Sequence, residues 1–361
     1  MFSKRLTVRW PALGLAIVAA AVVVAGAAAD GGTVAGGLAN PRGIAVGPSD
    51  RLLVVESATG AIDELRGGGS RTIATVPGAV DVATNGLGST YAVIGGPSPD
   101  GPPPPPGSNP ASLVRIAPNG KVDVVADIGA YQVTHPDPDD LDQPPNPSES
   151  NPNGLALLPG GNVLVADAAA NDLLRVDVQG RITTVAHFKP EFVPWGLPFG
   201  PPIGSIVPAE AVPTAVAVGP DGAYYVSELT GFPFAKGASR IWRVDPRSVD
   251  AVCDPVAPSG GCSSVATGFS SVIDITFGPG PRAGGTMYVL ELAKEGLAGA
   301  LVLGTEFPPT GALWVVKNGV RTLVSDKLAA PGGVAVDSGG AIFVTTLTFG
   351  PPGGSVLRLN G

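Results

Sequence analysis

The residues of this chain whose types and spacing could support chemistry are acids and amides at equivalent positions of a repeated segment. Four short apolar runs end in an acid, and these acids are Glu56, Asp167, Glu228 and Glu291. A second polar set is expected beside them, where the preceding runs begin: Asn40, Asn151, Asn153 and Asp274. Carboxylate and amide oxygens are the ligands that Ca²⁺ prefers, and crowded like charges call for a cation or a shared proton. Such a ring predicts a candidate calcium site.

A purely structural role competes with this hypothesis. An acid at a strand end can accept hydrogen bonds from the turn that follows, as the segment Asp167-Ala168-Ala169 suggests. A position that recurs usually meets a need that recurs, so the sequence favours turn support at the four repeated acids. Asp274 differs, because other copies have a small residue at its position, namely Gly43, Gly154 and Gly333. Asp274 is therefore the better functional candidate, although a backbone amide could also satisfy it.

The elements that must position these residues are short strands in a repeated order. The segment from Asn151 to Ala186 shows four apolar runs separated by turn-forming residues. Similar segments begin near Pro41, Pro77, Pro213, Val272 and Pro331, which gives six copies. A repeat of ~40 to 50 residues that cannot bury its own faces is typical of a β-propeller. We predict an all-β, six-bladed propeller of four-stranded antiparallel blades, with few helices.

The last copy has no fourth strand of its own. The segment Thr33 to Ala35 resembles the fourth strand of another copy, so we expect this N-terminal strand to complete the last blade and close the ring. The expected domains are a secretory signal peptide at 1–29 and one propeller at 30–361. The predicted blades are 38–76, 77–127, 150–187, 211–267, 268–325 and 328–361 plus 32–36.

The first 29 residues have the features of a secretory signal peptide. Lys4, Arg5 and Arg9 precede an apolar stretch, and the small residues Ala27 to Ala29 suit cleavage near Ala29. An uncleaved anchor is the alternative, which the Ala-rich composition and modest length disfavour. We expect a secreted or extracytoplasmic protein without membrane contact after cleavage. The formal charge of −8 provides no basic surface for nucleic acid, so we expect no nucleic-acid partner.

The two cysteines, Cys253 and Cys262, lie in a long connection between the third and fourth strands of the fourth copy. In an exported protein such a pair is most simply a disulfide that clips an irregular loop. A metal or redox role would need a further ligand or a two-residue spacing.

Long insertions are expected on one face of the disc, because all but the cysteine loop join second to third strands or one blade to the next. They are Gly95 to Pro110, Asp127 to Ser150, Phe188 to Ala211, Thr230 to Ala238, Leu292 to Thr310 and Thr348 to Gly354. Binding concentrates in long loops on a rigid scaffold. We predict a small-molecule or protein partner at this surface, which we call the long-loop face.

Two of these insertions differ in character. Tyr131 to Asn151 is acidic and contains His135, whereas Phe188 to Pro202 is aromatic and contains Trp195. Together they could line a pocket for a ligand with an apolar body, or the aromatic side chains could only pin their own loops. His135 could act as a base, although a lone loop histidine is more often simply exposed. The run Pro102 to Pro106 is expected to be stiff and solvated.

Several segments resemble the ScyD/ScyE family of exported NHL-like propellers. They are Asn40 to Gly47, Asn151 to Leu157 with Leu164 to Asp167 and Asn171 to Asp177, and above all Glu228 to Phe234. The resemblance spans nearly the whole chain after the leader, and it implies a six-bladed propeller. It brings no catalytic residues.

Motifs for catalysis are missing from the sequence. There is no Gly-x-Ser-x-Gly elbow, no His-Glu-x-x-His and no phosphate-binding glycine loop. The sequence favours a non-enzymatic binding or scaffold protein that uses the long-loop face. The alternative is a Ca-dependent hydrolase of the lactonase or esterase type with its site at the central channel, and Ca²⁺ is the one cofactor considered.

Overall fold

The computed structural model describes residues 32–66, 69–86, 89–97, 108–258, 260–278, 285–350 and 353–360. The predicted signal peptide at 1–29 and the run Pro102 to Pro106 lie outside these ranges. Within them, no helix is both long and apolar enough to cross a membrane.

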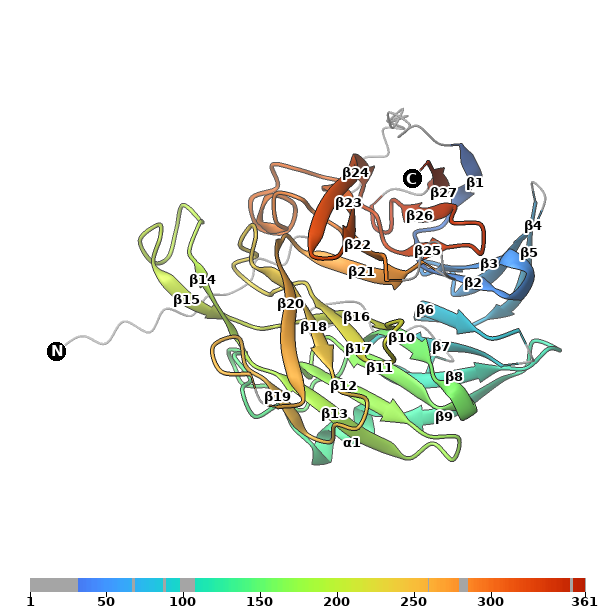
Figure 1. Ribbon diagram of the computed structural model, residues 1–361, viewed down its shortest axis with the longest axis horizontal. Helices are drawn as coiled ribbons and strands as arrows, with labels where there is room; N and C mark the ends of the chain where they lie inside the picture. Colours follow the sequence, from blue (N-terminus) through green and yellow to red (C-terminus); the bar gives the residue numbers. More distant parts are fainter. Residues whose placement is uncertain are drawn as a thin grey trace.

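Six antiparallel sheets are arranged around a central axis as the blades of a propeller, as predicted (Figure 1). The inner strands of blades one to six are β2 (Pro41–Gly47), β6 (Ala79–Thr84), β10 (Pro152–Leu157), β16 (Pro213–Val218), β21 (Val272–Phe277) and β25 (Val334–Val336). The second strands are β3 (Arg51–Glu56), β7 (Thr90–Ile94), β11 (Val163–Asp167), β17 (Tyr224–Glu228), β22 (Met287–Glu291) and β26 (Ile342–Thr346).

The third strands are β4 (Ala61–Arg66), β8 (Ser112–Ile116), β12 (Asp172–Val176), β18 (Ser239–Val244), β23 (Thr310–Lys317) and β27 (Gly354–Leu359). The outer strands are β5 (Gly69–Thr75), β9 (Val122–Asp127), β13 (Ile182–Phe188), β20 (Cys262–Phe269), β24 (Val320–Ala329) and β1 (Thr33–Leu38). Short helical turns occupy Pro48–Asp50, Pro159–Gly161 and Gly299–Leu303, and one α-helix, α1, spans Ile128–Thr134.

The ring is closed by the N-terminal strand. Strand β1 pairs antiparallel with β27, placing Thr33 opposite Leu357 and Ala35 opposite Val356. This confirms the predicted closure. Because the outermost strand of blade six comes from the start of the chain, opening the ring would require this pairing to break.

The core consists of apolar layers between neighbouring blades. Residues of a strand point alternately to its two faces, and in a propeller a neighbouring blade covers each face. The middle strands are therefore buried throughout, as in β11, where all five residues are buried. One such layer joins Leu53 and Ile62 of blade one to Val82 and Ile94 of blade two.

The inner strands approach one another so closely that small residues are required. A Cβ placed on Gly43 of β2 would lie 2.2 Å from Oδ1 and 2.5 Å from the Cα of Asp81 in β6. Gly154 and Gly333 face the same restriction against Ala215 and Arg42 of the next blades. The repeated glycine is therefore a packing requirement at the channel wall.

The cysteine loop links two blades. It contains a short strand, β19 (Ala251–Cys253), which joins blade three as a fifth strand running parallel to β13. The predicted disulfide between Cys253 and Cys262 is confirmed, with Cα atoms 5.3 Å apart. The loop is thus more regular than the sequence suggested, because its backbone groups pair with the exposed edge of β13.

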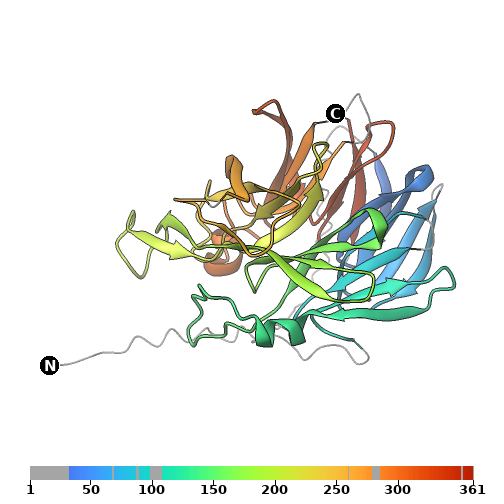
Figure 2. The ribbon, with the colours of Figure 1, turned by 60° about the horizontal axis from the view of Figure 1, so that its bottom comes forward.

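Two of the long insertions carry structure of their own. Helix α1 lies in the acidic insertion between blades two and three. The aromatic insertion forms a two-stranded hairpin, β14 (Glu191–Pro194) and β15 (Ile206–Ala209), which projects from the ring (Figures 1 and 2).

Replacing Gly43 with Ala is expected to reduce the free energy of unfolding by about 1–3 kcal/mol, because the new methyl group must displace the β6 backbone. Urea unfolding of Gly43→Ala would measure this loss. The matched control is Gly196→Ala, since a Cβ there meets nothing within 4 Å. Equal stability of the two variants would contradict the close packing at the channel.

Candidate functional site

A cavity of about 420 Å³ opens on the long-loop face beside the central channel. Its walls come from inner strands and second-to-third connections of blades one, five and six. They consist of Asn40, Arg42, Ser57, Ala58, Ile273, Leu292, Thr348, Phe349 and Gly350. The volume is that of a small-molecule site. The lining contains one charged side chain, Arg42, and no acid.

Arg42 lies near the start of β2, and its side chain reaches across the channel. Its Nη2 donates to Oδ1 of Asn153 in blade three at 2.7 Å. Burial lowers the pKa of Arg42 and the nearby Asp81 carboxyl acts in the opposite sense, so the guanidinium stays charged at neutral pH. Within the described residues Arg42 forms no ion pair. It is a cation without a bound counter-charge.

The rest of the cavity combines apolar walls with a few polar atoms. Ile273 and Leu292 are buried, and Phe349 packs on Phe307 with ring centroids 5.9 Å apart. The hydroxyl of Thr348 is buried without a hydrogen-bond partner among the described residues. Leaving such a group unpaired costs about 1–3 kcal/mol, so a ligand that reached it would gain affinity.

Asp81 and Asp274 occupy equivalent positions of blades two and five, which lie opposite each other in the ring. Oδ1 of each accepts from the next backbone amide in its own strand, at 2.8 Å in both cases. Oδ2 of each accepts from the following blade, Asp81 from Leu155 at 3.0 Å and Asp274 from Val334 at 2.7 Å. Both carboxyls therefore join their blade to the next one.

Burial dominates the titration of these two acids. It raises the pKa of Asp81 to about 7, against the two amides and Arg42, which lower it. Burial and the Asp81 carboxyl raise the pKa of Asp274 well above its usual value. Sequence reasoning found Asp274 and missed Asp81, although both replace the repeated glycine. The weaker second copy concealed that equivalence.

The four repeated acids do not converge on one point. Glu56 accepts from the amide of Ala39 at 2.6 Å, and Asp167 accepts from that of Asn151 at 2.6 Å. Glu291 accepts from the amide of Ser270 at 2.7 Å. In each case the donor belongs to the chain that leads into the inner strand of the same blade. This geometry supports the structural role of the acids, in which they accept hydrogen bonds from the backbone. The donors lie before the inner strand of the blade as well as in the turn that follows the acid.

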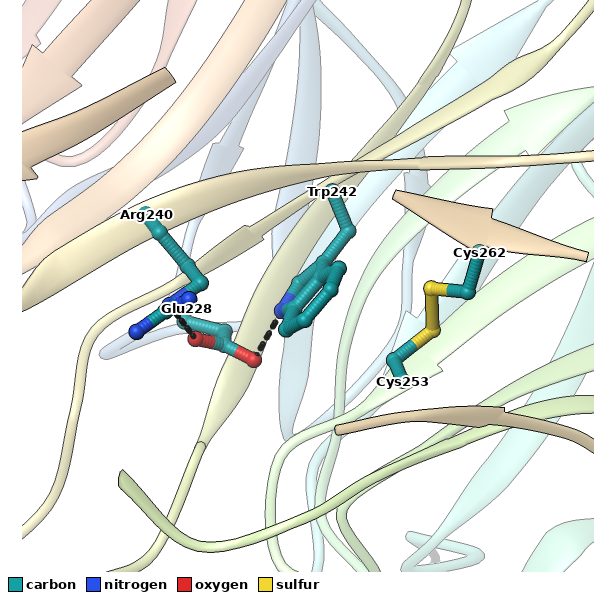
Figure 3. The surroundings of a disulfide bond; sticks show 5 residues. All are labelled: Glu228, Arg240, Trp242, Cys253 and Cys262. Atoms are coloured by element: carbon teal, nitrogen blue, oxygen red, sulfur yellow. Dashed lines mark hydrogen bonds and ion pairs between the residues drawn. A yellow bond between two sulfur atoms is a disulfide. The ribbon is translucent and has the colours of Figure 1, made fainter. Parts of the chain in front are cut away.

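Glu228 has a different environment (Figure 3). Its carboxyl accepts from the indole nitrogen of Trp242, and its other oxygen lies 3.7 Å from Nε of Arg240. Arg240 also pairs with Glu191 of the projecting hairpin. Burial and the neighbouring Glu191 raise the pKa of Glu228 well above its usual value. The group anchors the hairpin to blade four beside the disulfide.

The three predicted amides are all engaged within the fold. Asn40 has a left-handed backbone, with φ 52°, and donates to carbonyls in the 347–350 segment. Asn151 accepts from the amide of Gly96 at 3.0 Å. Asn153 holds Arg42 and donates to the carbonyl of Thr214 at 2.7 Å. Of the predicted site residues, Asn40 lines the cavity directly and Asn153 supports it through Arg42.

His135 and Trp195 lie elsewhere on the long-loop face. His135 ends α1 and stacks on Tyr131 with ring centroids 3.9 Å apart. Trp195 donates to the carbonyl of Phe199 at 2.7 Å and packs edge-on against Phe232 at 5.3 Å. Its geometry matches the interpretation in which aromatic side chains pin their loops.

One group of three carboxyls in the described residues could hold a metal ion, and it lies away from the channel. Asp140, Asp142 and Glu210 have ligand atoms within 4.8 Å of one another. Burial and nearby aspartates raise the pKa of Glu210 to about 7. Asp81 and Asp274 at the channel belong to no such group among the described residues, and each already accepts two backbone amides.

The fold places the chain among six-bladed β-propellers. It is similar to a putative oxidoreductase (glucose dehydrogenase) from Thermus thermophilus, with 18% identity, TM-score 0.55 and coverage of 92% of this chain and 100% of the other. A gluconolactonase from Xanthomonas campestris gives 10% identity, TM-score 0.54 and coverage of 92% and 88%. The PQQ-bound aldose sugar dehydrogenase from Streptomyces coelicolor gives 16% identity and a TM-score of 0.52, and the match covers 91% of this chain and 97% of the other.

These similarities establish the fold. No protein-family model matches the sequence, and no curated protein matches it.

The Asp81 carboxyl predicts a pH-dependent stability. Its pKa is about 7 when folded and about 3.9 when unfolded, so the folded state binds the proton more tightly. The contribution of Asp81 to the free energy of unfolding is complete below pH 4, decreases as the pH rises towards 7, and is lost above pH 7. Because the channel leaves Asp81 partly exposed, we expect a loss of about 1–3 kcal/mol across this range.

Urea unfolding of the wild type and Asp81→Asn from pH 4 to 8 would test this effect, since acids that do not interact with Asp81 titrate equally in both proteins; Asp274, whose pKa the Asp81 carboxyl raises, shares in the difference. The difference between them should change most between pH 4 and 7. Parallel pH profiles would show that Asp81 keeps an ordinary pKa.

Proposed function

We propose that this protein is an exported six-bladed propeller that binds a small molecule in the cavity beside its channel. The observation that carries the proposal is the composition of the cavity wall, where one unpaired cation and an unpartnered hydroxyl lie among apolar side chains. A small-molecule site typically has mostly apolar walls and a few polar groups that fix orientation. The long-loop face thus serves as the binding face.

Export and family membership belong to the same proposal. The disulfide and the leader-like segment at 1–29 support an extracytoplasmic location. The segments that resemble ScyD/ScyE proteins support placement in that family. One of them, Glu228 to Phe234, reaches from the anchor of the projecting hairpin into the loop that Trp195 contacts.

The Ca-dependent hydrolase remains the alternative function. Its support is the overall likeness to propellers that include gluconolactonases. At 10–13% identity this likeness concerns the fold. The channel carboxyls are committed to backbone amides, so we favour binding without turnover.

Filling the cavity is expected to abolish binding. In a ligand-observed NMR screen of a fragment library, fragments that bind the wild type should lose about tenfold or more in affinity for Ala58→Trp, because the indole occupies their space. The matched control is Ala169→Trp, at the equivalent turn position of blade three, outside the cavity. Thermal melts would confirm that both variants fold.

Fragments that bind Ala58→Trp as well as the wild type would contradict this location. A library without any binder would contradict the function. Calcium-dependent turnover of lactones or esters by the wild type would instead support the hydrolase.

A further inference from the structure

The cavity wall also indicates which class of molecule it takes. We propose that the ligand is an organic anion, with a carboxylate or similar group on Arg42 and an apolar body against Ile273, Leu292 and Phe349. This inference rests on the proposed function and adds the chemical class of the ligand.

The first step concerns charge. Eight other arginines form ion pairs within the described residues, namely Arg51, Arg66, Arg71, Arg115, Arg181, Arg240, Arg243 and Arg247. Arg42 has a neutral partner, Asn153, and no carboxylate oxygen within 4.0 Å in the same part of the chain. In a protein with 30 acids and 22 Lys and Arg, a guanidinium that forms no ion pair with a carboxylate is available to an external anion.

The second step concerns the nearest acids. Asp81 lies close enough to affect the pKa of Arg42, but both of its oxygens accept backbone amides from β6 and β10. Asp274 is held in the same way by β21 and β25. Neither carboxyl is free to rotate onto the guanidinium without breaking a link between blades. The channel therefore cannot easily supply Arg42 with an internal counter-ion.

The third step concerns orientation. Asn153 accepts a hydrogen bond from one guanidinium nitrogen of Arg42, Nη2, and donates one to the carbonyl of Thr214, which fixes its orientation. An arginine has five N–H donors in a planar fork, so one hydrogen bond leaves most of the fork for a ligand. The same arginine lines the cavity, where Ile273, Leu292 and Phe349 provide apolar walls. A purely inorganic anion would leave those apolar walls uncovered, whereas an anion with an apolar body would cover them.

The size of the cavity sets the scale of the body. About 420 Å³ lies towards the small end of the range for small-molecule sites, so we expect a compact body such as one or two fused rings. The ring of Phe349, which packs on Phe307, can pack against such a ring. The buried Thr348 hydroxyl offers one additional hydrogen bond.

Calorimetry with a matched pair of probes tests the inference. We expect wild-type protein at pH 7 to bind 1-naphthylacetate about tenfold or more tightly than 1-naphthylacetamide, which has the same rings without the charge. Arg42→Gln should remove this preference and Arg42→Lys should keep part of it. The control for loss of one positive charge is Arg115→Gln, whose side chain is 52% exposed on β8 outside the cavity.

The outcomes separate the two proposals. Equal binding of acid and amide, abolished for both by Ala58→Trp, would overturn the anionic ligand and leave the small-molecule site intact. Failure of both probes to bind would also overturn the anionic ligand, and the fragment screen would then decide the proposed function alone. If Arg42→Gln failed to fold, the comparison of acid and amide on the wild type would still decide, because it needs no variant.

Discussion

The contact between neighbouring inner strands is the constraint on which the rest of the structure depends. Among the described residues, five of the six blade junctions carry a side-chain hydrogen bond between inner strands or to the strand beside them. The links are Asp81 to Leu155, Asn153 to Thr214, Thr214 to Val272, Asp274 to Val334 and Thr345 to Arg42. The sixth junction, between blades one and two, is packed through Gly43. Buried backbone groups at the channel thus find partners in the adjacent blade.

This requirement explains how buried acids at the channel find hydrogen-bond partners. A carboxylate has two oxygens, so Asp81 and Asp274 can each bond their own strand and the next one at once. A glycine or alanine at this position forms no side-chain hydrogen bond to the next blade. In blades three and four the preceding residue, Asn153 or Thr214, forms that hydrogen bond instead. The acids and the small residues are alternative solutions to one structural problem. Arg42 is the exception, because its guanidinium extends away from the junction that its carbonyl completes.

The sequence was sufficient for the fold because its signals are local and repeated. Strands β2, β16 and β21 begin at Pro41, Pro213 and Val272, where the repeated segments begin, and the closing strand was recognisable from its likeness to another outer strand. The functional candidates were harder, because a repeat shows which positions are equivalent but not where each side chain points. Arg42 stood in a recognised segment, yet only the folded ring brings it beside Ile273 and Thr348, which are distant in the chain. The β19 strand was also missed, since it pairs outside its own blade.

The asymmetry of the cavity follows from the same logic. Repeated side chains such as Asp167 and Glu291 accept hydrogen bonds from the segment that leads into each blade. Because these contacts repeat around the ring, they do not make one sector of the face different from another. The cavity arises where blade six departs from the repeat, through the loop from Thr348 to Gly350, which faces the turn at Ser57 and Ala58 of blade one. Blade six has Thr346 where four other blades have an acid, so blade six adds no carboxylate of this kind beside the cavity. An organic anion bound there would meet Arg42, the one charged side chain of the lining.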